Sequence, residues 1–193
     1  MKVFGFCGTF GAGKGTAIEI FTRILSDKGT VYSFSTSDLF RAELRKKGLS
    51  TDRETLRTFA NEMRKTYGAG YAGKLAVKAI NEQEPDYALV DALRNPAEVE
   101  TLKKFYGDNF TLIAIDAPIK TRYERTQMRN RNKEDQLTFE EFKASEELEL
   151  KTLDPNGQRI YDVMKMATEK IENAASEKEL EKKLKELIQV KIK

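Results

Sequence analysis

A glycine-rich segment near the start of the chain has the residue types and the spacing needed to bind phosphate. It runs from Gly8 to Thr16 as GTFGAGKGT, after a short apolar run at 3–7 that is typical of a buried strand. The apolar side chains of residues 17–25 then recur at helical spacing. A strand, a glycine loop and a helix in this order are the context that a phosphate-binding loop requires, and the alternative is an ordinary glycine turn.

The glycines and the lysine of this segment have separate parts in that chemistry. Gly8, Gly11, Gly13 and Gly15 are expected to let the backbone turn with positive φ and approach an anion closely. Successive N–H groups and the helix N-terminus supply partial positive charge. Lys14 adds a full positive charge at the β- and γ-phosphates of a nucleotide.

The residue after the lysine helps to decide which class of phosphate-binding loop the chain has. GTPases and large ATPases usually place Ser or Thr directly after the lysine to bind magnesium, whereas this chain has Gly15 there and Thr16 one position later. We therefore expect Thr16 to contact phosphate, and direct binding of magnesium by Thr16 is the alternative.

Charged side chains lie at the ends of three further predicted strands, at 30–35, 86–92 and 109–116, or shortly after them. These side chains are Asp38, Arg41, Asp91, Arg94, Arg122, Arg125, Arg129 and Arg131. Ligands of parallel sheets gather at the carboxyl ends of the strands, so we expect these side chains to lie near the glycine loop. The alternative for each arginine is an ion pair at the surface.

Strands that alternate with helices predict an α/β fold of three layers, in which a parallel five-stranded sheet has helices on both faces. The fifth strand is expected at 168–173. Helix starts are predicted from capping pairs, which are Thr51 with Glu54, Asn95 with Glu98, Thr138 with Glu141 and Ser176 with Glu179. No repeat or linker is evident, so residues 1–193 are expected to form one domain.

Composition excludes several classes of site. The 193 residues contain no histidine, which rules out histidine metal sites and histidine-based triads. The single cysteine, Cys7, cannot form an internal disulfide and is expected to pack at the end of the first strand. A net charge of +3 is too weak to indicate a protein that binds nucleic acid. With no apolar run of membrane length and no signal-peptide pattern, we expect a cytoplasmic protein without a membrane partner.

Basic residues are concentrated between Arg41 and Lys78. This stretch holds ten Lys and Arg against four Asp and Glu. A solvated helix face explains part of the excess, but its place beside a phosphate-binding loop favours an anionic acceptor.

The chain resembles the nucleoside monophosphate kinase superfamily in three further segments. Its glycine loop, GxxGxGKGT, is similar to that of adenylate kinase. Residues 35–41 (STSDLFR) are similar to the STGDxxR segment that lines the acceptor site, residues 90–94 (VDALR) resemble DGxxR, and residues 122–131 resemble the start of the lid. The resemblance implies an acceptor-binding segment at about 36–84 and a lid-like segment at about 119–158.

The end of the chain is more similar to dephospho-CoA kinase, in which an Asn near the adenine follows the last strand, as Asn173 does here. Over nearly its whole length the chain most resembles an archaeal family of adenylate-kinase-related, dephospho-CoA-kinase-like proteins. There are departures, because Ala92 replaces the glycine of DGxxR and Ser145-Glu146 stands where an Arg-Asp pair is common.

The resemblance implies ATP and Mg²⁺ as cofactors and a small nucleotide as the acceptor. Asp91 would hold magnesium through water, and Arg125 and Arg129 would close over the transferred group. Residues Gly8, Gly11, Ala12, Gly13, Lys14, Gly15, Thr16 and Asn173 would bind ATP. Residues Thr36, Arg41 and Arg94 would bind the acceptor.

Asp38 separates two kinds of kinase. A phosphate acceptor needs no base, and Asp38 would then cap its helix, whereas a ribose hydroxyl acceptor would need Asp38 as a general base. The two acceptor arginines favour phosphate.

Two other classes of nucleotide-binding protein are alternatives to a kinase. A nucleotide-binding regulator without turnover is one of them. A GTP-driven switch is the other, because residues 132–135 spell NKxD and residues 154–158 spell DxxGQ. Their order is reversed relative to GTPases, and we expect both matches to be chance.

Overall fold

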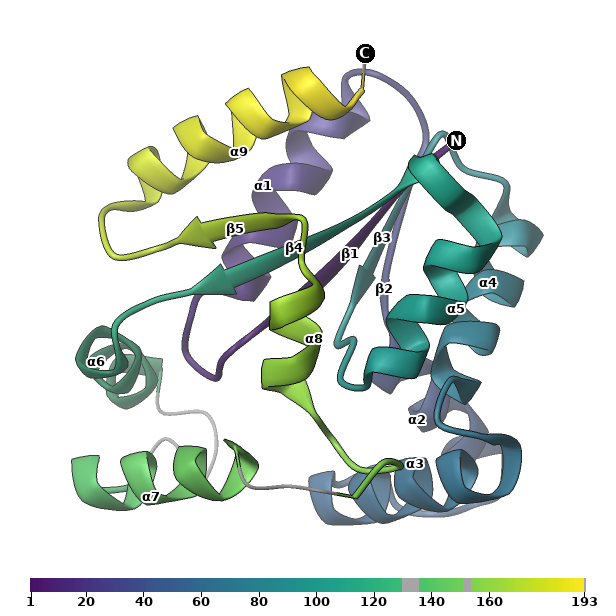
Figure 1. Cartoon of the computed structure of the whole chain (residues 1–193), viewed down its shortest axis with the longest axis vertical. Helices are drawn as coiled ribbons and strands as arrows, with labels where there is room; N and C mark the ends of the chain where they lie inside the picture. Colours follow the sequence, from purple (N-terminus) through teal and green to yellow (C-terminus); the bar gives the residue numbers. More distant parts are fainter. Residues whose placement is uncertain (130–135, 151–153, 193) are drawn as a thin grey trace.

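The computed structural model describes residues 1–129, 136–150 and 154–192. Its centre is a five-stranded sheet in which every neighbouring pair is parallel, in the order β2-β3-β1-β4-β5 (Figure 1). The strands are β1 (Lys2–Gly8), β2 (Val31–Ser35), β3 (Tyr87–Asp91), β4 (Phe110–Asp116) and β5 (Glu169–Glu172). The predicted parallel five-stranded α/β sheet is confirmed.

The central strands are buried on both faces, as their continuous apolar runs predict. All five inner residues of β1 and of β4 are buried, whereas the edge strand β2 is only half-buried. Gly5 of β1 lies between Val90 of β3 and Leu112 of β4 in the register of the sheet.

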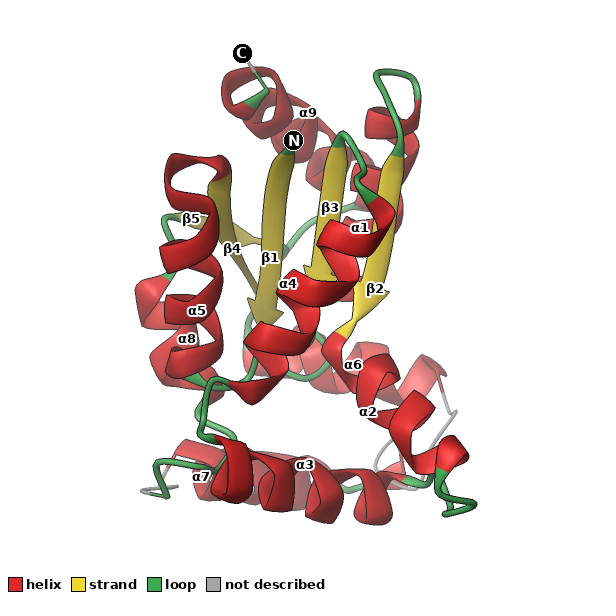
Figure 2. Ribbon diagram, turned by 90° about the vertical axis from the view of Figure 1, so that its right-hand side faces the viewer, coloured by secondary structure: helices red, strands yellow, loops and turns green. Residues whose placement is uncertain are grey.

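Helices cover both faces of the sheet (Figure 2). One face carries α4 (Tyr71–Gln83), α5 (Pro96–Tyr106) and α8 (Ile160–Met166), which share an apolar cluster with β1, β3 and β4. The other face carries α1 (Lys14–Ser26) and α9 (Glu177–Lys191), which pack in a second cluster around Phe6, Phe21 and Leu184. A 3₁₀ turn, η1 (Gly107–Asn109), joins α5 to β4.

Two helical segments extend beyond the carboxyl ends of the strands (Figure 1). The first holds α2 (Thr36–Lys46) and α3 (Arg53–Tyr67), which form a small apolar cluster of their own with α4, around Phe40, Leu44 and Phe59. The second holds α6 (Ile119–Arg129) and α7 (Phe139–Leu150). The carboxyl edge of the sheet therefore lies between them.

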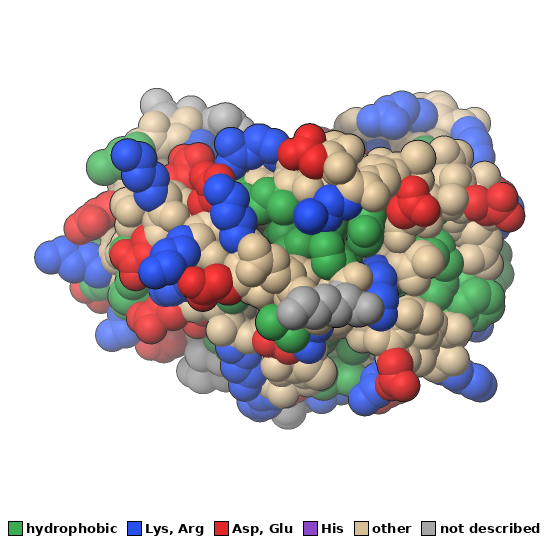
Figure 3. Space-filling model, turned by 90° about the horizontal axis from the view of Figure 1, so that it is seen from above, with side chains coloured by type: hydrophobic (Ala, Val, Ile, Leu, Met, Phe, Trp, Pro, Cys, Tyr) green, Lys and Arg blue, Asp and Glu red, His purple; other side chains and the backbone are tan. Residues whose placement is uncertain are grey.

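The opposite end of the molecule, near both termini, carries side chains of mixed charge (Figure 3). Lys and Arg are interspersed there with Asp and Glu around a central group of hydrophobic side chains. No helix within the described parts of the chain is both long and apolar enough to cross a membrane.

Most predicted helix starts are confirmed, and one is wrong. The side chains of Asn95, Thr138 and Ser176 accept hydrogen bonds at the starts of α5, α7 and α9. Helix α3 is instead capped by Asp52, whose carboxylate accepts the Thr55 N–H at 3.0 Å. Thr51 lies one residue too early to do so.

Neither α4 nor α8 was predicted as a separate helix, although α4 lies within the helical segment at about 36–84 that the resemblance implies. Helix α4 starts after Gly70 without a side-chain cap, and α8 is only seven residues long, too short for a periodic pattern. Of the two GTPase-like motifs, residues 132–135 lie outside the described residues, as does Arg131. Residues 154–157 form a turn in which the Gly157 N–H donates to the Asp154 carbonyl at 3.0 Å.

Candidate active site

A cavity of about 520 Å³ lies at the carboxyl end of β1, against the start of α1. The glycine loop forms one wall, and charged side chains from elsewhere in the chain reach it. The predicted site residues that line the cavity are Gly8, Gly11, Ala12, Gly13, Lys14, Gly15, Thr16, Arg94, Arg125 and Arg129. The structure thus brings together the loop, one predicted acceptor arginine and two arginines of α6.

The glycine loop is held by close contacts that only a residue without a side chain permits. Gly13 has φ +87°, and a Cβ there would lie 2.3 Å from Nδ2 of Asn173. Asn173 is buried after β5, and its Nδ2 donates to the Ala12 carbonyl at 2.9 Å. Asn173 therefore supports the loop backbone and does not line the cavity.

Gly15 differs from the other loop glycines. It lies in the first turn of α1, and its φ is not positive, so the predicted left-handed turn at this residue is wrong. A Cβ at Gly15 would meet nothing within 4 Å. The residue leaves open space at the helix N-terminus on the wall of the cavity.

Lys14 is paired with an acid at the end of the neighbouring strand. Its Nζ lies 3.1 Å from Oδ1 of Asp91, and both side chains are about one-quarter exposed, at 25% and 27%. The next residue, Ala92, has φ +61°, a left-handed conformation that costs a residue with a Cβ about 1–2 kcal/mol. This strain explains why glycine is the usual residue of the DGxxR motif.

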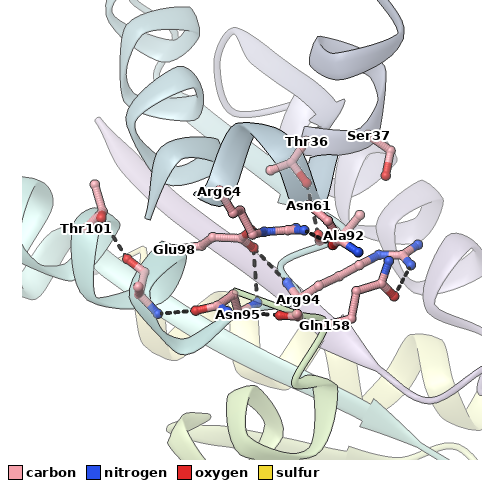
Figure 4. A network of polar contacts seen from close by, with 12 residues as sticks. Thr36, Ser37, Asn61, Arg64, Ala92, Arg94, Asn95, Glu98, Thr101 and Gln158 are labelled. Atoms are coloured by element: carbon pink, nitrogen blue, oxygen red, sulfur yellow. Dashed lines mark hydrogen bonds and ion pairs between the residues drawn. The ribbon is translucent and has the colours of Figure 1, made fainter. Parts of the chain in front are cut away.

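Arg94 extends from the loop after β3 toward the turn that precedes α8 (Figure 4). Its Nη1 donates to Oε1 of Gln158 at 2.8 Å, and its backbone N–H donates to Glu98. Thr36 lies close by, but its buried hydroxyl donates to the Ala92 carbonyl at 2.9 Å and does not line the cavity.

Asp38 and Arg41 form an ion pair on α2, outside the cavity lining. The Arg41 Nη1 lies 2.8 Å from Oδ1 of Asp38, whose side chain is 61% exposed. Ser35 caps α2 by accepting the Ser37 N–H. Of the two alternatives for Asp38, the role of helix cap is therefore wrong, because Ser35 is the cap and Asp38 lies inside the first turn.

The arginines of α6 separate into two groups. Arg125 donates to the Asn173 carbonyl at 2.9 Å, and the Arg129 guanidinium lies 5.0 Å from the Phe10 ring; both residues line the cavity. Arg122 is only 5% exposed, and its donors bind the carbonyls of Ala117 and Phe10 and the Glu146 carboxylate. Arg122 therefore joins the start of α6 to the glycine loop and to α7.

Cys7 lies beneath the loop as a buried thiol. Burial raises its pKa to about 12, and the nearby Lys14 ammonium offsets only part of that rise. The thiol is therefore protonated at neutral pH, as a packing role requires.

Magnesium would have few protein ligands here. Within the described ranges, no group of three or more His, Cys, Asp or Glu side chains could hold a metal ion. Mg²⁺ commonly keeps several waters and binds through one or two protein oxygens together with substrate phosphates. The hydroxyl of Thr16, which lines the cavity, and the Asp91 carboxylate, which is paired with Lys14, are a donor set of that kind.

The sequence did not reveal a buried ion pair next to Arg94. Arg64 of α3 and Glu98 of α5 are 2% and 0% exposed, and the Arg64 Nη2 lies 2.9 Å from Oε1 of Glu98 (Figure 4). Arg64 contributed to the basic excess and Glu98 to a capping pair, but no local signal links residues so far apart in the chain.

Comparison with known proteins gives matches along most of the chain. Residues 7–143 match the AAA domain family. A UPF0200/UPF0201 protein of Archaeoglobus fulgidus is 33% identical over 190 residues, which are 97% of this chain and 55% of that protein. The chain thus spans about half the length of that relative. A UPF0200 protein of Methanosarcina mazei is 33% identical over 150 residues, which are 78% of this chain and 77% of that protein.

The fold is also found among solved structures. The crystal structure of shikimate kinase from Aquifex aeolicus matches with a TM-score of 0.52 at 16% identity, and the match covers 97% of this chain and 96% of that one. A likeness at this level of identity concerns the fold, which is that of a P-loop kinase.

Proposed function

The chain belongs to the AAA domain family and to the UPF0200 proteins, with the fold of a P-loop kinase, and from that premise we propose that it transfers a phosphoryl group from ATP to a small nucleotide. The observation that carries the proposal is the cavity in which the glycine loop and Lys14 face Arg94, Arg125 and Arg129. Phosphoryl transfer needs neutralisation of charge and alignment of the reacting groups more than covalent help from the protein. Four cations around one anion-binding loop supply both.

On the donor side, the loop N–H groups and the N-terminus of α1 would bind the β- and γ-phosphates. Lys14 would leave Asp91 for the phosphates, and Asp91 would then be available to hold the water shell of magnesium, with Thr16 as a second oxygen donor. The metal supplies neutralisation of phosphate charge when bound. Arg125 and Arg129 would hold the transferred group from the side of α6.

On the acceptor side, Arg94 would bind an anionic group and Arg41 would approach it from α2. The Asp38 carboxylate is exposed and paired with Arg41, which supports a phosphate acceptor over a hydroxyl acceptor that needs a free base. Phosphorylation of a 3′-hydroxyl, as in dephospho-CoA kinase, is the alternative. A nucleotide-binding regulator without turnover is a second alternative.

The test is an ATP-consumption assay with Mg²⁺, run in parallel against the common ribo- and deoxynucleoside monophosphates and dephospho-CoA. A selective signal with one monophosphate is the expected result. A signal with dephospho-CoA alone would reassign Asp38 as the base. Silence across the panel, with ATP still bound, would support the regulator.

Lys14→Ala tests the donor site separately. It is expected to abolish turnover and most ATP affinity while the protein stays folded, because it removes the cation at the phosphates. Lys28→Ala, at an exposed lysine just after α1, is the matched control and should behave as the wild type. Normal turnover of the Lys14 variant would refute the assignment.

A further inference from the structure

The ion pair between Arg64 and Glu98 is almost fully withdrawn from solvent. The Arg64 Nε and Nη2 both donate to Oε1 of Glu98, at 3.0 and 2.9 Å, and Nη1 donates to Asn61 at 3.3 Å. A buried ion pair of this kind is weak evidence for stability, because apolar side chains of similar volume often stabilise as well or better. A role in fixing geometry is therefore worth testing.

The other oxygen of the same carboxylate holds the Arg94 loop. Oε2 of Glu98 accepts the backbone N–H groups of Arg94 at 2.8 Å and of Asn95 at 3.2 Å. An ordinary capping box needs only the bond to the Asn95 N–H. Here one carboxylate joins α3, through Arg64, to the backbone of the arginine that faces the cavity (Figure 4).

The Arg94 loop is also tied to the turn before α8. The Asn95 Nδ2 donates to the carbonyls of Pro155 at 2.8 Å and Gly157 at 3.0 Å. The Arg94 Nη1 donates to Gln158, and the Arg94 carbonyl accepts the Arg159 N–H at 2.6 Å. Residues 94 and 95 are thus held from both sides, by α3 and by the turn that follows α7.

We propose that Arg64 and Glu98 are positioning residues that present the Arg94 guanidinium to an anionic acceptor and couple α3 to the 154–158 turn. The inference rests on the proposed function, in which Arg94 binds the acceptor phosphate. Neither residue lines the cavity, so both act through Arg94.

The double variant Arg64→Met/Glu98→Gln removes the coupling of the Arg94 loop to α3 and leaves the other contacts of the loop in place. The amide that replaces the Glu98 carboxylate keeps an oxygen for the backbone N–H groups of Arg94 and Asn95. The methionine that replaces Arg64 fills the buried volume without leaving an unpaired charge. Lys78→Met/Glu82→Gln makes the same kind of change at an exposed pair on α4, with side chains 74% and 61% exposed, and is the matched control. Arg64→Lys keeps a cation beside Glu98 and provides a conservative variant.

The experiment fills the donor site with Mg²⁺ and the non-hydrolysable ATP analogue AMP-PNP, and then titrates inorganic phosphate by calorimetry. Arg94→Met and the double variant are both expected to weaken phosphate binding at least tenfold. Their AMP-PNP affinity and cooperative thermal transition should stay as in the wild type. Arg64→Lys should bind phosphate better than the double variant, and the control pair should bind it as the wild type does.

Each other outcome overturns a defined step. If Arg94→Met weakens phosphate binding and the double variant does not, the positioning role is wrong and the proposed function stands. If the double variant loses AMP-PNP affinity in parallel, the pair has only a structural role. If the wild type does not bind phosphate, or Arg94→Met leaves its binding unchanged, Arg94 is not an acceptor ligand, and both proposals lose their acceptor site.

Discussion

Gly13→Ala is expected to destabilise the protein by about 3 kcal/mol, and the structure separates this cost into two parts. The left-handed backbone at φ +87° costs an alanine about 1–2 kcal/mol. The added Cβ also displaces Asn173 Nδ2, which lies 2.3 Å away, and the Ala12 carbonyl then loses its buried hydrogen bond at about 1–2 kcal/mol. The end of a side chain can move aside, so we add no further cost for the clash.

Gly15→Ala is the matched control, two residues along the same loop. Its φ is not positive and a Cβ meets nothing within 4 Å, so stability should change by less than about 1 kcal/mol. On the proposed function, the same Cβ enters the space where phosphate binds and weakens AMP-PNP binding. One glycine is thus needed by the fold and the other by the ligand.

Thermal unfolding distinguishes the two variants. In a chain of this size, 1 kcal/mol corresponds to about 2–4 °C in Tm, so Gly13→Ala should lower Tm by roughly 6–12 °C. Gly15→Ala should stay within a few degrees of the wild type. If the two variants have the same Tm, whether both values fall or both stay near that of the wild type, the reasoning is refuted.

Three further predictions concern single residues. Ala92→Gly should raise the free energy of unfolding by up to about 1 kcal/mol in urea denaturation, because glycine relieves the φ of +61° but adds unfolded-state entropy; a clear loss of stability would contradict the strain. The buried Cys7 thiol, whose pKa is raised to about 12, should react with a thiol reagent at neutral pH only as fast as the region opens, and labelling at the rate of a free thiol would contradict its burial. Asp86 accepts two hydrogen bonds from Thr30, which lower its pKa below the ordinary 3.8. Its contribution is therefore present above that value and is lost as the pH falls through the lower folded pKa, so Asp86→Asn should unfold with a weaker dependence on pH below about 4 in an acid titration.

The sheet could be predicted because burial leaves a direct pattern in the sequence. Strands β1 and β4 are covered on both faces, which requires continuous apolar runs, and Asn95 with Glu98 is a specific start signal. The start of α3 was misplaced by one residue because Thr51 and Asp52 are both good caps. Only the backbone decides between such neighbours.

The site was partly predictable for a similar reason. Asp91 ends β3, and Lys14 follows β1 after the glycine loop. Because β1 and β3 are parallel neighbours, the topology brings both residues to the same edge of the sheet. Arg122, Arg125 and Arg129 share a helix face by spacing, but the first lies at the helix start, where carbonyls of the glycine loop and of Ala117 bind it. Contacts such as Arg64 with Glu98 depend on how α3 packs against α5, which no local pattern encodes.

The ion pair between Lys14 and Asp91 has a consequence for how fast an anion is captured. At a distance, the ion pair of Lys14 and Asp91 acts on an anion as a dipole and not as a bare charge. Electrostatic steering of the anion must therefore come from the other charges around the cavity. The association rate of a triphosphate should then fall less steeply with ionic strength than the number of cations suggests. Asp91→Asn would unmask the lysine and steepen that dependence, which stopped-flow measurements at several salt concentrations can follow.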